Sequence, residues 1–88
     1  MGTRSDLIVK AEDVINGDRH STYGDARESF ETIAKMWSAY LGVDVTAEQV
    51  AAMMVLMKVS RQRKSKHMDN WIDIIGYAAL GGEIEGGK

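Results

Sequence analysis

The stretch TAEQVAAMMVLMKVSRQRK, from Thr46 to Lys64, most constrains the fold of this chain, because it is apolar at one end and basic at the other. No charged or strongly polar side chain interrupts it between Val50 and Met57. A helix that is apolar on all sides must be enclosed by other helices or by a second subunit. We therefore predict a central helix with a buried stem and a cationic end that begins at Lys58.

The start of this helix has the pattern of a capping box. The Thr46 hydroxyl can accept a hydrogen bond from the backbone of Gln49, and the Gln49 side chain can reach back to the backbone N–H of Thr46. Val45 and Val50 are spaced as a hydrophobic staple across the helix entry. The start of the central helix is thus predicted in detail.

Apolar residues recur at helical spacing in the segments on either side as well. Asp25 and Asp69 are candidate N-caps, and Gly42 and the pair Gly81-Gly82 are candidate helix ends. The expected helices span residues 5–16, 25–41, 46–64 and 69–80.

The expected fold is an all-α, compact four-helix domain around the central apolar helix. The 88 residues suit one domain, residues 1–88, whose tail, residues 81–88, cannot bury itself and should fray. Trp37, Trp71 and Tyr77 lie on apolar stripes and are predicted to be core side chains. With 44% hydrophobic residues and six methionines, a homo-oligomer would bury more apolar surface than one small core can.

Charge and composition exclude several classes of protein. The formal net charge of -2 argues against general nucleic-acid binding, which needs a broad basic surface. No cysteine is present, so disulfides and thiolate metal sites are excluded. The longest apolar run is too short to span a bilayer, and the polar N-terminus lacks the core of a signal peptide. We expect a soluble, cytoplasmic protein with no membrane partner.

Two pairs of acids are candidate metal ligands. Glu28 and Glu31, like Asp69 and Asp73, are spaced to share one helix face, so four carboxylates could converge on Mg²⁺ if the two helices face each other. The alternative is that the glutamates are a solvated pair in a first turn, favoured by the helix dipole, and that Asp69 is only a cap.

Asp73 lies in an apolar helix and needs a partner, for which Lys58 and Arg61 are the candidates. One interpretation is a structural ion pair of Asp73 with Arg61, which would fix how two helices pack. Another is that Asp73 orients Arg61 or Lys58 toward a phosphate, with Lys64 as a further contact. The two interpretations are compatible.

The segment DRHSTYGD is a candidate binding loop. Arg19 and His20 can contact phosphate, Tyr23 can stack on a base, and Gly24 lets the backbone approach a ligand. The alternative is a tight connection in which Tyr23 covers the edge of the core. His20 and His67 are too isolated in the sequence to form a metal pair, and no phosphate-binding loop or nucleophile motif occurs.

Four motifs together resemble a helical domain of unknown function that is widespread in phages and prophages. They are R-x-x-x-YGD from Arg19, F-x-x-IAKMWSAYLG from Phe30, MMVLMKVSR from Met53 and DNWIDIIGYAAL from Asp69. This resemblance covers about Arg19 to Leu80 and implies no settled activity.

A more distant resemblance, to all-α nucleoside triphosphate pyrophosphatases of the MazG type, implies a magnesium site. Glu28 and Glu31 would match part of the E-E-x-x-E motif, but Arg27 stands at its leading glutamate. Asn70 and Asp73 keep only the aspartate of the E-x-x-D motif. These departures favour binding over hydrolysis.

The sequence therefore leaves three hypotheses for a phage protein in the cytoplasm of an infected bacterium. The first is a non-catalytic protein that binds a phosphate-containing nucleotide and needs no cofactor, with sequestration of a nucleotide immune signal (anti-defence) as one purpose. The second is a Mg²⁺-dependent nucleotide pyrophosphohydrolase. The third is a structural or host-protein-binding oligomer.

Overall fold

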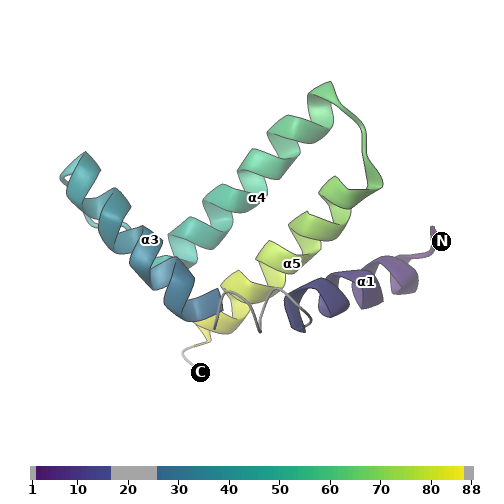
Figure 1. Cartoon of the computed structure of the whole chain (residues 1–88), viewed down its shortest axis with the longest axis horizontal. Helices are drawn as coiled ribbons and strands as arrows, with labels where there is room; N and C mark the ends of the chain where they lie inside the picture. Colours follow the sequence, from purple (N-terminus) through teal and green to yellow (C-terminus); the bar gives the residue numbers. More distant parts are fainter. Residues whose placement is uncertain (1, 17–25, 87–88) are drawn as a thin grey trace.

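The computed structural model describes residues 2–16 and 26–86, which form four α-helices and their connections (Figure 1). The helices are α1 (Arg4–Asn16), α3 (Ala26–Leu41), α4 (Ala47–Lys64) and α5 (Met68–Glu85). The predicted all-α fold with four helices is confirmed. None of these helices is long and apolar enough to cross a membrane.

The helices are arranged around a hairpin of α4 and α5, which run side by side in opposite directions (Figure 1). α3 packs on the part of the hairpin where α4 begins and α5 ends. Among the described helices, α1 packs only on α5. One side of α4 is therefore covered by α3 and α5, and its other side has no neighbour among these helices.

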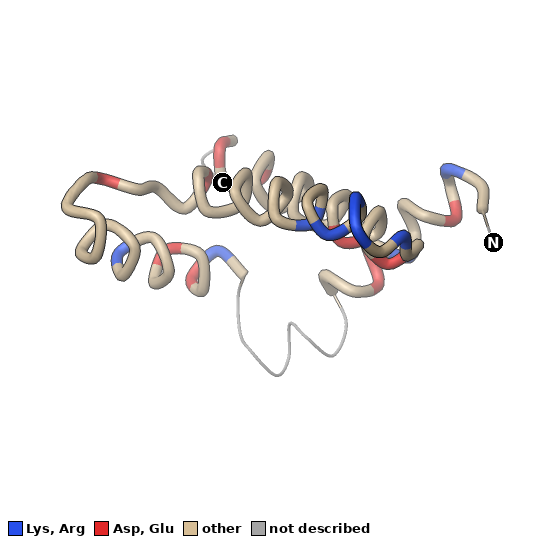
Figure 2. Tube along the Cα trace, turned by 90° about the horizontal axis from the view of Figure 1, so that it is seen from above, with Lys and Arg blue, Asp and Glu red and all other residues tan. Residues whose placement is uncertain are grey.

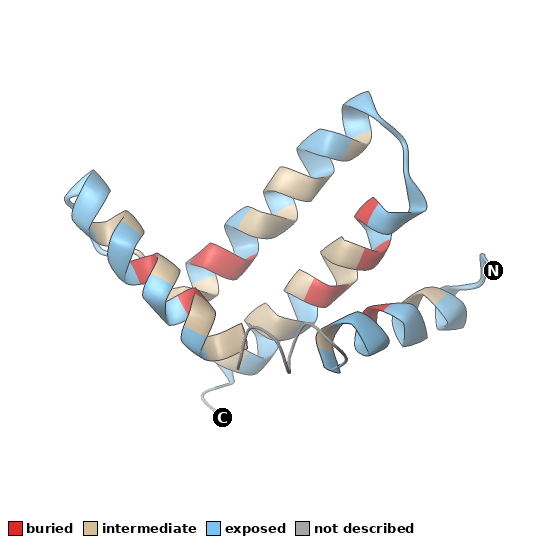
Figure 3. Cartoon of the chain, in the orientation of Figure 1, coloured by how far each residue is buried: buried red, intermediate tan, exposed pale blue. Residues whose placement is uncertain are grey.

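The hydrophobic core lies where α3 meets the hairpin (Figure 3). Its buried side chains come from α3 and α4: Phe30, Ala34, Val50 and Ala51. From α5, Tyr77 places its ring 6.2 Å from that of Phe30, centroid to centroid. Tyr77 and Trp37 are partly buried against this cluster, as predicted, whereas Trp71 is 49% exposed and the prediction that it belongs to the core is wrong.

The start of α4 and the end of α3 form as the sequence predicts. The backbone N–H of Gln49 donates to the Thr46 hydroxyl at 3.1 Å, and the Thr46 N–H donates to the Gln49 side chain at 2.9 Å. Gly42 ends α3 with a φ of +75°, a left-handed conformation that glycine adopts at little cost. Ser38 adds a contact not foreseen, since its hydroxyl accepts from the Val45 N–H at 2.8 Å and fixes the connection between the helices.

The end of α5 differs from the prediction. The helix continues through Gly81 and Gly82 to Glu85, and Ile84 packs against the core, so residues 83–85 are not frayed. Close packing explains why residue 81 is a glycine, because a Cβ at this position would lie 3.0 Å from the Cβ of Ala51 in α4. The glycine thus allows α5 to approach α4 closely in the middle of a helix.

The start of α5 also differs. The N-cap position is His67, which makes no side-chain capping bond, and Asp69 lies inside the first turn, so the predicted Asp69 cap is wrong. The predicted cap at Asp25 lies outside the described residues.

Candidate functional site at the basic end of α4

Lysine and arginine residues follow one another closely at the end of α4 and in the connection after it (Figure 2). They are Lys58, Arg61, Arg63, Lys64 and Lys66. Cations at the C-terminus of a helix interact favourably with the helix dipole, so the basic residues in the last turn stabilise α4. The same charges form a local cationic surface on a chain whose net charge is -2.

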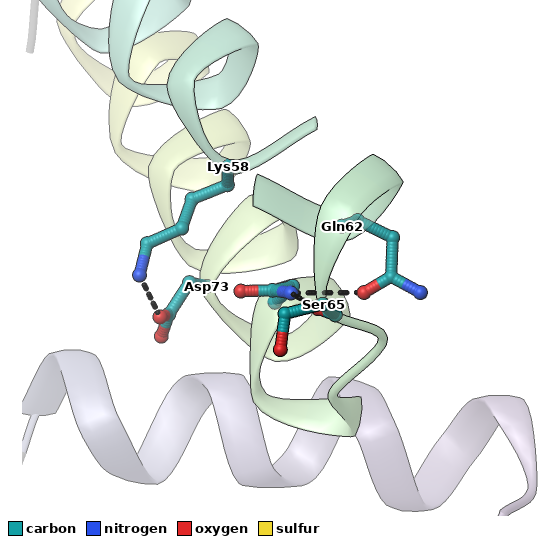
Figure 4. A network of polar contacts seen from close by, with 5 residues as sticks. Lys58, Gln62, Ser65 and Asp73 are labelled. Carbon is teal, nitrogen blue, oxygen red and sulfur yellow. Dashed lines mark hydrogen bonds and ion pairs between the residues drawn. The ribbon is translucent and has the colours of Figure 1, made fainter. Parts of the chain in front are cut away.

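Lys58 is tied to α5 by an ion pair. Its Nζ lies 2.7 Å from Oδ2 of Asp73, and the two side chains are only 14% and 29% exposed (Figure 4). Of the two predicted partners for Asp73, Lys58 is therefore the one in contact. Arg61 is exposed and makes no ion pair with any described residue, so the predicted Arg61–Asp73 pair does not form.

One turn before Asp73 in α5, Asn70 closes the connection between α4 and α5 through hydrogen bonds to Gln62 and Ser65, which Figure 4 labels. Its amide donates to Oε1 of Gln62 at 2.9 Å and to the carbonyl oxygen of Ser65 at 3.1 Å. Gln62 Oε1 also accepts from the His67 N–H at 3.2 Å. Asn70 is 6% exposed and its two bonds are partly buried, whereas the bond from the His67 N–H is exposed.

Sequence reasoning missed this network. The available signal was an amide side chain at the start of an apolar helix, where a buried polar group must find partners. In the structure, the role of Asn70 is to hold the hairpin of α4 and α5.

The acids proposed as a magnesium cage are not gathered. Glu28, Glu31 and Asp69 are exposed, and Asp73 is paired with Lys58. Among the described residues, no three His, Cys, Asp or Glu side chains come together to hold a metal ion.

Arg27, which replaces the leading glutamate of the MazG-type pattern, donates from Nη2 to the carbonyl oxygen of Glu83 at 3.2 Å. It therefore links α3 to the last turn of α5. The predicted loop contacts Arg19, His20 and Tyr23 lie outside the described residues and stay predictions.

Within residues 2–16 and 26–86, the fold and this charged hairpin define an all-α arrangement of four helices with a basic helix end. Residues 6–85 match the family described as Domain of unknown function (DUF6378), and the chain belongs to this family. The sequence is also 46% identical over 76 residues to the Gene 55 protein of Mycobacterium phage L5, covering 84% of this chain and 49% of the relative.

The Gene 55 protein of Mycobacterium phage D29 is 37% identical over 73 residues, which cover 82% of this chain and 48% of that protein. The chain thus spans about half the length of the phage proteins that it matches. These relatives confirm the resemblance to a phage domain of unknown function. No solved structure matches the chain.

Proposed function

We propose that this protein binds a phosphate-containing nucleotide at the basic end of α4 and does not transform it. The proposal rests on the exposure and the ion pairing of the cations at that end of α4. Arg61 and Lys64 are exposed and have no ion-pair partner within the described ranges, and Lys58 is held beside them by Asp73. A guanidinium group that is not engaged with a carboxylate is available to bind phosphate oxygens in a bidentate manner.

In this proposal each residue has a separate role. Arg61 and Lys64 neutralise the phosphates, and Asp73 positions the Lys58 ammonium group rather than neutralising it outright. Arg19, His20 and Tyr23 contact the sugar or base. A small binder of this kind would serve a phage by sequestering a nucleotide immune signal of the infected bacterium.

A Mg²⁺-dependent pyrophosphohydrolase has less support, because Glu28, Glu31, Asp69 and Asp73 do not converge in the described part of the chain. An oligomer that acts on a host protein would show no nucleotide binding. One experiment separates these three functions.

The purified protein is incubated with Mg²⁺ and a mixture of nucleoside triphosphates, cyclic dinucleotides and cyclic ADP-ribose isomers. Unbound material is removed, the protein is heat-denatured, and both fractions are chromatographed. We expect release of one intact nucleotide in near-stoichiometric amount. Conversion of triphosphates to monophosphates would replace binding with hydrolysis, and no retained nucleotide would reject both.

Arg61→Ala should weaken this binding at least about tenfold, because a charge-assisted hydrogen bond to phosphate contributes about 1.5–3 kcal/mol. Lys35→Ala is the matched control, since Lys35 is an exposed cation on α3 away from the hairpin end. Isothermal titration with the nucleotide released in the first experiment measures both variants. Unchanged affinity of Arg61→Ala would contradict the assigned site.

A further inference from the structure

The side of α4 that faces away from α5 is apolar and uncovered. Its middle is formed by five exposed residues without charge: Ala52, Met53, Leu56, Val59 and Ser60. The large ones are well exposed, with Met53 at 42%, Leu56 at 66% and Val59 at 50%. We call these five residues the outer face of α4. A continuous apolar helix face of this kind marks an interaction surface.

The accessible area of the chain indicates an open shape. The structure exposes 6428 Å², whereas a folded monomer of 9.7 kDa is expected to expose about 5,100 Å². The difference of about 1,300 Å² belongs to the chain as a whole, and the roughly 800 Å² that each partner buries in a standard interface lies within it. The radius of gyration of 13.6 Å, against about 12 Å expected for 88 residues, shows the same open shape.

We propose that the outer face of α4 packs antiparallel against the same face of a second copy of this chain, about a two-fold axis near Leu56. Charges at the two ends of the face support this arrangement. An α-helix turns by about 100° per residue, so Glu48 and Arg63 lie on the same side of α4 as Ala52 and Val59. Glu48 and Arg63 are about 22 Å apart along the helix axis. Antiparallel packing brings Glu48 of each copy to Arg63 of the other.

Both charges are available for such a contact, because neither Glu48 nor Arg63 has an ion-pair partner among the residues described. A parallel arrangement would instead place like charges together at both ends. The two-fold symmetry makes the interface self-complementary, as closed dimers require.

The side chains in this register also fit by size. When Glu48 faces Arg63, Ala52 faces Val59, so a small residue lies opposite a branched one and the two helices can approach closely. Beside the start of the outer face lies a shallow depression lined by Val43, Asp44, Val45, Gln49, Ala52 and Met53. This depression leaves room for the side chains at the C-terminal end of the partner's α4.

The first test is the molar mass in solution by light scattering of wild-type protein, Leu56→Asp and Met36→Asp. The control is matched, because Met36 on α3 is 65% exposed and Leu56 is 66% exposed. We expect wild type and Met36→Asp at a multiple of 9.7 kDa and Leu56→Asp at half that mass or less. Circular dichroism of each variant confirms that the helices are retained.

A monomeric wild type, or a Leu56→Asp variant that keeps the wild-type mass, would overturn the proposal.

A second test, by cysteine cross-linking, does not depend on a substitution that disrupts the interface. The chain has no cysteine, so Leu56→Cys gives a single thiol close to the two-fold axis. Oxidation should link nearly all Leu56→Cys chains into dimers and leave Met36→Cys largely unlinked, and equal linking of both would count against the outer face.

Charge reversal tests the antiparallel register. Glu48→Arg and Arg63→Glu should each weaken association about tenfold, because each change acts at two symmetric contacts worth about 0.7 kcal/mol apiece. The double variant should recover association. Failure of the double variant to recover, with both single variants weakened, would reject the antiparallel orientation.

Discussion

At the scale of single residues, Gly81 decides how closely two helices can pack. A Cβ at this position would lie 3.0 Å from the Cβ of Ala51, which is 1% exposed and has no side-chain freedom with which to move aside. Gly82, the next residue, has nothing within 4 Å of its Cβ position. Two adjacent glycines in one helix therefore have opposite packing environments.

We predict that Gly81→Ala destabilises the protein by about 1 kcal/mol, because the overlap with Ala51 costs about 1–3 kcal/mol and outweighs the gain in helix propensity. Gly82→Ala should be neutral or stabilising by up to about 1 kcal/mol, since only the propensity changes. Urea denaturation of the two variants measures the difference. A Gly81→Ala variant as stable as Gly82→Ala would show that α4 and α5 can separate freely.

The sequence could not reveal this role of Gly81. A glycine pair after an apolar stripe is the usual sign of a helix end, and only the distance to Ala51, thirty positions earlier, explains why α5 continues. The position of Trp71 was equally hard to predict. Its apolar stripe was visible in the sequence, but the sequence did not show that none of the described helices covers that side of α5.

At the scale of the elements, the connection between α4 and α5 depends on the buried amide of Asn70. We predict that Asn70→Asp destabilises the protein by about 1–3 kcal/mol, because a carboxylate would face the oxygen acceptors of Gln62 and Ser65 with no hydrogen to donate. Thermal unfolding followed by circular dichroism measures the loss. Asp69→Asn, a change at an exposed neighbour, is the control and should have a far smaller effect.

Elements were predictable where their signals are local. The capping box of Thr46 and Gln49 and the left-handed Gly42 depend on residues a few positions apart, and both formed as expected. The partner of Asp73 was not decided by the sequence, because Lys58 and Arg61 are one turn apart. The choice between them depends on how α4 is rotated against α5.

At the scale of the whole molecule, self-association should make stability depend on concentration. We predict that the melting temperature of wild-type protein rises by several degrees when its concentration is raised a hundredfold, since a dimer gains about 1.4 kcal/mol for each tenfold increase. Leu56→Asp should show no such rise. Differential scanning calorimetry over the concentration range measures it, and a constant wild-type melting temperature would argue against a dimer coupled to folding.

The four helices of the described residues were predictable from apolar periodicity, but the openness of their arrangement was not. The sequence predicted a central helix enclosed by other helices or by a second subunit, and among the described helices α3 and α5 cover α4 on one side only. Periodicity shows which residues can be buried and says nothing of how many helices one chain supplies to bury them.

The packing of α1 on α5 alone has a consequence for synthesis of the chain. α1 leaves the ribosome before the other described helices, whereas its partner is made last. At about 5–20 residues per second, the 51 residues between α1 and α5 (17–67) take about 2.5–10 seconds to translate. During that time Leu7, Ala11 and Ile15 have no α5 to pack on, so the apolar side of α1 stays exposed until α5 is made.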